Sequence, residues 1–363
     1  MNEGDDAPLS PRLQTGLIGH EAAEAAFLEA WSAGRLAHAW LISGPRGIGK
    51  ATLAYRIARF VLAGGGGSGG LFGDVPQNLE ISPDSQVFRR VAMGGHADLK
   101  VLERGWADDK KTRMRGEIPV ADVREVGGFL SLTPAEGGWR VVIVDAADEM
   151  NRSSANAILK VLEEPPRNAL LLLLAHSPGR LLPTIRSRCR RLTLRPLADD
   201  QVELLLRRHR PDLEAGDAAA LARLAEGSIG KALGLAEAGG LPLYRDMVGF
   251  FNALPRLDVP ALHQFCEAAA KADGAFRTVT ELFSWWLARA AAQAGRAGAG
   301  AASEAVPGEA GLQSRLVRVA GLDRWVELWE KTRDLFSRAD AVNLDRKQVL
   351  LNAFFAVERC CRP

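Results

Sequence analysis

The sequence predicts an α/β domain with a parallel sheet, followed by an all-α half. Two apolar runs predict strands, AWLIS at 39–43 and RVVIVD ending in Asp145, and each leads into residues with helical spacing. A third run, ALLLLLA at 169–175, is apolar at every position, as in central parallel strands that are buried on both faces. Beyond Pro196 the apolar residues recur with the period of an α-helix, and no strand pattern appears. Strands separated by helices favour an α/β layer architecture, and the second half is predicted to be helical.

The helices between these strands have their own signals. Leu53, Ile57 and Phe60 recur at helical spacing directly after the first strand. The segment Ser153–Leu162 is predicted to be a helix that ends before Pro165 and Pro166, because proline cannot continue a helix. The glycine-rich stretches at 63–70 and 294–311 are predicted to be a surface insertion and a loop between helices.

Composition restricts the class of protein. The 363 residues suggest two or three domains, and 47% hydrophobic with 25% charged residues is typical of a globular chain. The net charge of +2 gives no overall argument for nucleic acid or membrane as a partner. The acidic, polar start does not resemble a signal peptide and no apolar run could span a bilayer, so we expect a cytoplasmic protein.

A glycine-rich loop, SGPRGIGKAT at 43–52, follows the first predicted strand and precedes a helix. Gly44, Gly49 and Lys50 fit the pattern GxxxxGK, in which backbone N–H groups and a lysine bind phosphates. A plain glycine turn that ends in lysine is the alternative. The candidate nucleotide-contacting residues of the loop are Gly44, Pro45, Arg46, Gly47, Ile48, Gly49, Lys50, Ala51 and Thr52.

Two groups needed for hydrolysis are absent from their expected positions. Ala51 cannot supply the hydroxyl that binds Mg²⁺, and Thr52 points about 100° away around the helix axis. Asp145 stands where a magnesium-binding carboxylate is expected, but the next residue is Ala146 and not the glutamate that orients water. The sequence therefore predicts ATP or ADP binding with weak or absent Mg²⁺ and without efficient hydrolysis.

The segment 180–195 is rich in arginine and has three interpretations. It is a solvated basic strand edge, a nucleic-acid patch, or the carrier of an arginine finger for a neighbouring subunit's nucleotide. Stacking aromatic residues are missing nearby, which disfavours the patch. Before this segment, His176 and Ser177 follow the third strand, where a polar side chain can sense a γ-phosphate.

Cysteine and tryptophan give weaker signals. The four cysteines form no CxxC pair, so we expect neither a zinc site nor another metal site. The pairs Trp285–Trp286 and Trp325–Trp329 suggest either a protein interface or an intramolecular core.

Several segments together resemble the delta-prime subunit family of the bacterial DNA polymerase III clamp loader, which are AAA+ relatives. The resemblance covers roughly 17–240. The matching segments are LIGHEAAEAAFLEAWSAGRLAHAWLISGPRGIGK, HADLKVLER, VVIVDAADEM through ANAILKVLEEPP, LLPTIRSRC, and EGSIGKAL at 226–233.

The resemblance implies three domains: an AAA+ P-loop domain at 1–197, a helical lid at 198–240 and a helical collar for oligomerisation at 241–363. It also implies roles for single residues. Ser187, Arg188 and Cys189 match the family's SRC motif, in which Arg188 is the finger acting in trans. Ser177 or His176 falls at the sensor 1 position, and Lys231 replaces the sensor 2 arginine of ATPase relatives. The family often carries four zinc cysteines after the first helix, and this chain has none there.

The function implied is that of an accessory subunit that is not catalytic alone. Its expected partners are the gamma/tau and delta subunits in a hetero-pentamer, the sliding clamp, and primed DNA through the complex. One alternative is an autonomous ATPase of the gamma/tau type that uses Thr52 for Mg²⁺ and Asp148 or Glu149 to activate water. Another is a nucleic-acid adaptor that uses Lys110–Arg115 or the arginine-rich segment.

Overall fold

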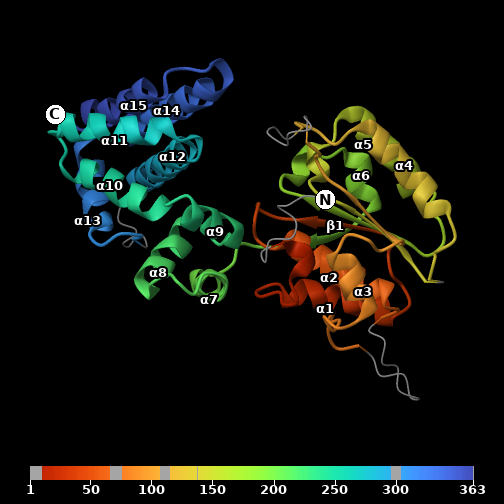
Figure 1. Ribbon diagram of the computed structural model, residues 1–363. Coiled ribbons are helices and arrows are strands. Elements are labelled where there is room, and N and C mark those ends of the chain that lie inside the picture. Colours follow the sequence, from red (N-terminus) through yellow and green to blue (C-terminus); the bar gives the residue numbers. More distant parts are fainter. Residues whose placement is uncertain (1–9, 66–75, 107–114, 137, 296–303, 363) are drawn as a thin grey trace. The chain divides into compact units, whose positions relative to one another are not determined.

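The computed structural model describes residues 10–65, 76–106, 115–136, 138–295 and 304–362 (Figure 1). The chain divides into two compact units, Met1–Gln201 and Val202–Pro363. This boundary lies in the first turn of the helix that follows the predicted end of the α/β domain at 197. The further division of the helical half at 240 stays a prediction.

The N-terminal unit is built on one parallel sheet of five strands. Their order is β2-β3-β4-β1-β5, so the chain crosses over between neighbouring strands. The strands are β1 (Ala39–Ser43), β2 (Leu99–Leu102), β3 (Arg140–Val144), β4 (Ala169–Ala175) and β5 (Arg190–Thr193). The prediction of a parallel α/β sheet is confirmed. Strand β3 ends at Val144, one residue before its predicted end, so Asp145 lies just beyond the strand.

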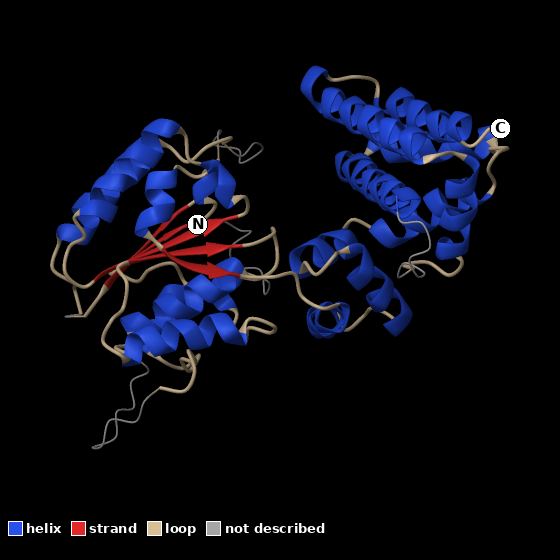
Figure 2. Cartoon of the chain, turned by 180° about the vertical axis from the view of Figure 1, so that it is seen from behind, coloured by secondary structure: helices blue, strands red, loops and turns tan. Residues whose placement is uncertain are grey.

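Alternate strand residues face two separate helical layers (Figure 2). Leu41 and Leu171 belong to the core beneath the layer that contains α4, α5 and α6, whereas Trp40 and Leu172 belong to the core beneath α1 and α2. All seven residues of β4 are buried, as its unbroken apolar sequence predicts. The helices are α1 (Glu21–Ser32), α2 (Lys50–Leu62), α3 (Gln86–Ala92), α4 (Val120–Ser131), α5 (Arg152–Glu163) and α6 (Pro183–Arg188), with 3₁₀ turns at Pro11–Leu13, Ala147–Glu149 and Pro178–Arg180.

The arginine-rich segment has two structures. Its first part is the short helix α6, which begins at Pro183, a residue favoured at a helix start because its missing N–H is not needed there. Its second part is the edge strand β5, in which only Leu192 is buried. The strand-edge interpretation is therefore correct for Arg190–Thr193 and wrong for the residues of α6, including Arg188.

The C-terminal unit is helical throughout its described residues. Its helices are α7 (Asp199–His209), α8 (Ala215–Leu224), α9 (Ile229–Glu237), α10 (Gly240–Asn252), α11 (Val259–Lys271), α12 (Asp273–Gly295), α13 (Glu309–Val319), α14 (Leu322–Val342) and α15 (Arg346–Cys360). Trp286 and Trp325 are fully buried, with ring centroids 6.1 Å apart, and Trp285 is nearly buried. These three tryptophans therefore form an intramolecular core, whereas Trp329 is half-buried beside Arg333.

Parts of two predicted loops lie outside the described residues: 66–70 of the first glycine-rich stretch and 296–303 of the second. At the described end of the second, α13 already begins at Glu309. The basic segment Lys110–Arg115 also falls outside the description except for Arg115. No helix among the described residues has the length and apolar character that a membrane span requires.

Candidate functional site

The glycine-rich loop lies where β1 ends and α2 begins. Gly44 has a φ of +151°, and a Cβ atom there would lie 2.5 Å from the carbonyl oxygen of Leu194, so only glycine fits without movement of the backbone. The Gly44 N–H donates to the carbonyl of Ala175 at the end of β4, over 3.2 Å. Gly49, with φ of +107°, is the residue that precedes α2. The strand, loop and helix context that the phosphate-loop pattern requires is therefore present.

The side chain of Lys50 is bound by the loop itself. It is only 4% exposed, and its Nζ donates to the carbonyl oxygens of Gly44 at 2.8 Å and Pro45 at 2.6 Å. Burial lowers the pKa of Lys50 to about 8, against the opposing effect of Asp145 and Asp148. The imidazole Nε2 of buried His20 lies 2.7 Å from the carbonyl oxygen of Ile48, a second side-chain contact with the loop backbone. The lysine is thus satisfied without a nucleotide.

Asp145 lies just beyond the end of β3 and interacts electrostatically with Lys50. Burial raises the pKa of this carboxyl group, and the charge of Lys50 opposes that effect. The next residue, Ala146, has a φ of +60°, a left-handed conformation that costs a non-glycine residue about 1–2 kcal/mol. The chain turns here, and a side chain at this position is buried.

The two acidic residues that follow are engaged in other contacts. The carboxylate of Asp148 accepts the backbone N–H of His176 at 3.1 Å and of Ser177 at 2.8 Å. Glu149 forms ion pairs with Arg46 of the glycine-rich loop, at 3.3 Å, and with Arg104, at 2.5 Å. Both carboxylates thus join separate segments of the N-terminal unit, an arrangement that disfavours either as a water-activating base.

His176 and Ser177 lie at the end of β4, next to this cluster. Burial, reinforced by the charge of Lys50, lowers the pKa of His176 to about 4, so the ring is neutral at neutral pH. Its Nδ1 is buried and has no hydrogen-bond partner among the described residues. The sequence correctly placed this pair after the third strand, but it did not reveal that Asp148 orients the backbone of both residues.

The SRC residues end α6, and each has a different environment. The Ser187 hydroxyl donates to the carbonyl of Thr184 at 3.1 Å, and Arg188 Nη1 donates to the same carbonyl at 3.0 Å. Arg188 Nη2 also pairs with Glu163 Oε1 at 2.9 Å, with the arginine side chain 36% exposed. Cys189 is buried in the core beneath α5 and α6. The motif therefore has an anchor in the core next to a guanidinium at the surface.

The cysteines are expected to resist alkylation in the folded protein. Burial raises the pKa of Cys189, Cys266 and Cys361 to about 12 and raises that of Cys360 as well, which removes the reactive thiolate at neutral pH. Iodoacetamide at pH 8, read by mass spectrometry, should label Cys189 at the rate of unfolding and not at the rate of a free thiol. Fast labelling without urea would contradict the buried placement.

Lys231 belongs to the C-terminal unit, in the first turn of α9. Its backbone N–H donates to the hydroxyl of Ser228, and its Nζ lies 3.6 Å from Glu226. Its position relative to the glycine-rich loop stays a prediction.

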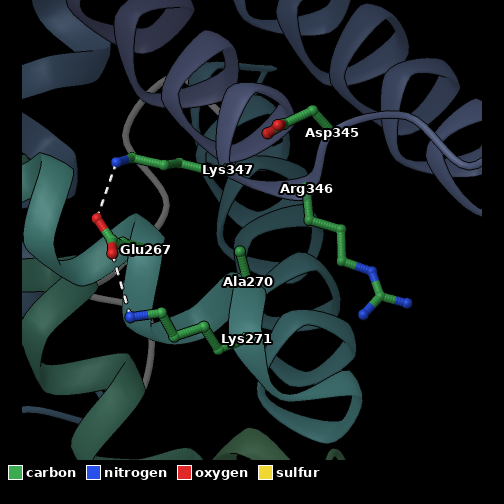
Figure 3. Close-up of a pocket in the computed structure, with 6 residues that line it drawn as sticks. All are labelled: Glu267, Ala270, Lys271, Asp345, Arg346 and Lys347. Carbon is green, nitrogen blue, oxygen red and sulfur yellow. Dashed lines mark hydrogen bonds and ion pairs between the residues drawn. The ribbon is translucent and has the colours of Figure 1, made fainter.

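A surface pocket of about 280 Å³ in the C-terminal unit lies between α11 and α15 (Figure 3). Glu267 accepts from Lys347 at 3.0 Å and pairs with Lys271 at 3.1 Å, so these lysines are neutralised within the chain. Arg346 stacks over Phe276. We therefore interpret the pocket as a shallow feature of the surface and not as a ligand-binding site. Within the described ranges, no group of three or more metal-ligating side chains comes together.

Comparison with known proteins shows what the chain is similar to. Residues 19–198 match the family described as DNA polymerase III, delta subunit. Over 153 residues the chain is 40% identical to DNA polymerase III subunit delta' of Pseudomonas aeruginosa, a stretch that is 42% of each protein. Over 171 residues it is 31% identical to subunit delta' of Bacillus subtilis, covering 47% of this chain and 45% of that protein.

A subunit of the other type is also similar. The chain is 31% identical over 231 residues to DNA polymerase III subunit tau of Escherichia coli, covering 62% of this chain and 33% of that protein. The chain thus spans less than half the length of these three relatives. Residues 19–198 therefore match the DNA polymerase III delta-subunit family, and the chain is similar to delta' subunits.

Proposed function

We propose that this protein is an accessory subunit of a bacterial DNA polymerase III clamp loader, of the delta' type. It holds a place in a ring with gamma/tau and delta subunits in the cytoplasm and helps to load the sliding clamp onto primed DNA. The observation that carries the proposal is a phosphate-loop pattern between a strand and a helix that lacks the expected hydrolytic groups, in the same unit as a surface arginine in an SRC motif. In this proposal, the ATP that Arg188 helps to hydrolyse is bound by a neighbouring subunit.

In this proposal Arg188 is the catalytic residue, and it acts on a neighbouring subunit's nucleotide. A guanidinium close to the transferred phosphoryl group neutralises the charge that develops there. Cys189 supports this role because it fixes the backbone beside Arg188 in the core while the guanidinium stays half-exposed. Ser177 and Lys231 are proposed to contact nucleotide in the sensor 1 and sensor 2 positions.

ATP or ADP binding to this chain itself is the weaker part of the proposal. A nucleotide must replace the two carbonyl oxygens that now bind Lys50, so part of the binding free energy is lost in opening the loop. Ala51 and Ala146 have no side-chain oxygen, so Asp145 remains as the group that could bind Mg²⁺. We therefore expect weak binding and no useful hydrolysis.

Binding of ATP should weaken as the pH rises through 8. The pKa of Lys50 is about 8 in the closed loop, so above that pH most molecules carry a neutral amine that does not attract phosphate. If only the charged form binds, affinity falls about tenfold between pH 7 and pH 9. A fluorescent ATP analogue titrated at both pH values measures this. Lys50→Arg, which stays charged, should bind with similar affinity at both; a pH-independent affinity of the natural chain would contradict the prediction.

Reconstitution tests the proposed function. The isolated chain should show no magnesium-dependent ATP turnover, and adding it to gamma/tau and delta subunits from the same organism should raise DNA-dependent turnover and clamp loading. The autonomous ATPase predicts the opposite for the isolated chain, with turnover abolished by Lys50→Ala. Failure of the chain to join the complex would refute the proposal.

A further inference from the structure

The pairing of Arg188 with Glu163 assigns a role to a second side chain. Helix α5 ends at Glu163, and α6, which ends at Arg188, packs against α5 (Figure 1). The pair forms through Nη2 of Arg188 and Oε1 of Glu163, 2.9 Å apart. The two residues are distant in sequence, so only the fold brings them together.

The backbones on both sides of this pair are fixed by one core. Ile185 and Cys189, which flank Arg188, are buried in the same cluster as Val161 and Leu162 of α5. The side chains above this core stay accessible, with 36% exposure for Arg188 and 50% for Glu163. The distance between the two Cα positions is therefore set by packing, while the ionic contact remains open to solvent and to another protein.

The guanidinium has two partners within its own chain and keeps donors for a third. Nη1 donates to the carbonyl oxygen of Thr184, and Nη2 forms an ion pair with Glu163, on two different helices. One acceptor and one ion-pair partner restrict the orientation of a guanidinium, which carries five N–H donors in a rigid fork. The other N–H groups are therefore left to donate to a phosphoryl group.

We propose that Glu163 is a positioning residue for the Arg188 finger. The carboxylate restricts the long, flexible arginine to an orientation from which its remaining donors reach a neighbour's nucleotide. An ion pair this exposed is weak, so it can orient the arginine side chain without preventing it from binding a phosphate. This inference rests on the proposed function, because it needs Arg188 to act in trans.

Glu163→Gln in the assembled loader is the central test. An oriented finger stabilises the transition state and not bound substrate, so its disorder should lower kcat about two- to fivefold and leave KM unchanged. Glu163→Asp should restore part of the loss. Glu164→Gln is the matched control, since Glu164 is the next residue, exposed at the same helix end; it should leave kcat unchanged. Gel filtration should show equal assembly for all variants.

The same substitution in an Arg188→Ala background separates this inference from the proposed function. There, Glu163→Gln should have no further effect, because the residue it orients is gone. If Arg188→Ala itself leaves turnover unchanged, the proposed function fails. If Arg188→Ala slows turnover while Glu163→Gln leaves kcat unchanged, raises it, or lowers it equally in both backgrounds, the finger stands and the role of Glu163 is refuted.

Discussion

Arg188→Ala should lower ATP hydrolysis at the receiving site of the assembled loader by at least about 10³-fold. Arginine fingers contribute about 10³ to 10⁵ in rate, because the charge that develops on the phosphoryl group is neutralised by a preorganised cation. In the free chain the guanidinium is half-exposed, with its backbone anchored by buried Cys189. Its removal should therefore cost catalysis and leave the fold intact.

Single-turnover hydrolysis is the appropriate measurement, because other subunits retain their own sites. Arg188→Lys should recover only part of the rate, since a lysine keeps the charge but lacks the planar fork. Arg180→Ala is the control: Arg180 is exposed in the same arginine-rich segment but lies in a 3₁₀ turn outside the SRC motif. Equal losses for Arg180 and Arg188 would point to a general electrostatic effect and against a finger.

The sequence was sufficient for elements whose signal is local. The apolar run at Ala169–Ala175 specifies a buried strand because every position packs against a helical layer. Helix α2 follows from its apolar spacing. Strand β5 gives almost no such signal because only Leu192 is buried, and α6 has just six residues, of which only Ile185 is buried.

The candidate site was predictable in its residues and not in its contacts. The pattern GxxxxGK identified Lys50, but not that the lysine binds the carbonyls of its own loop. The contact of His20 with Ile48 spans 28 positions and that of Arg46 with Glu149 spans 103, so no local pattern encodes them. The role of Glu163 was hidden for the same reason, since it depends on the packing of α5 against α6.

Asp148→Ala should destabilise the N-terminal unit by about 3 kcal/mol. The carboxylate of Asp148 is 8% exposed and accepts the N–H groups of His176 and Ser177. Alanine would leave both N–H groups, which lie in a part-buried contact, without this acceptor, and each such loss costs about 1–3 kcal/mol. Asp148→Asn keeps one neutral acceptor and should cost about half as much. Asp84→Ala, at a side chain that is 93% exposed, should change stability by less than about 0.5 kcal/mol.

Hydrogen exchange of the His176 and Ser177 amides reports this effect where it arises, and it avoids treating the two units as one unfolding transition. Both amides should exchange faster in Asp148→Ala, by the factor that corresponds to the loss in the free energy of unfolding. The experiment also discriminates between functions. If Asp148 activates water, its removal should abolish turnover without changing the protection of these amides. If Asp148 is structural, its removal should reduce their protection, because it connects the turn after β3 to the end of β4. That connection keeps Asp145 and Lys50 near His176 and Ser177, so the phosphate loop can retain its shape whether or not the chain hydrolyses ATP.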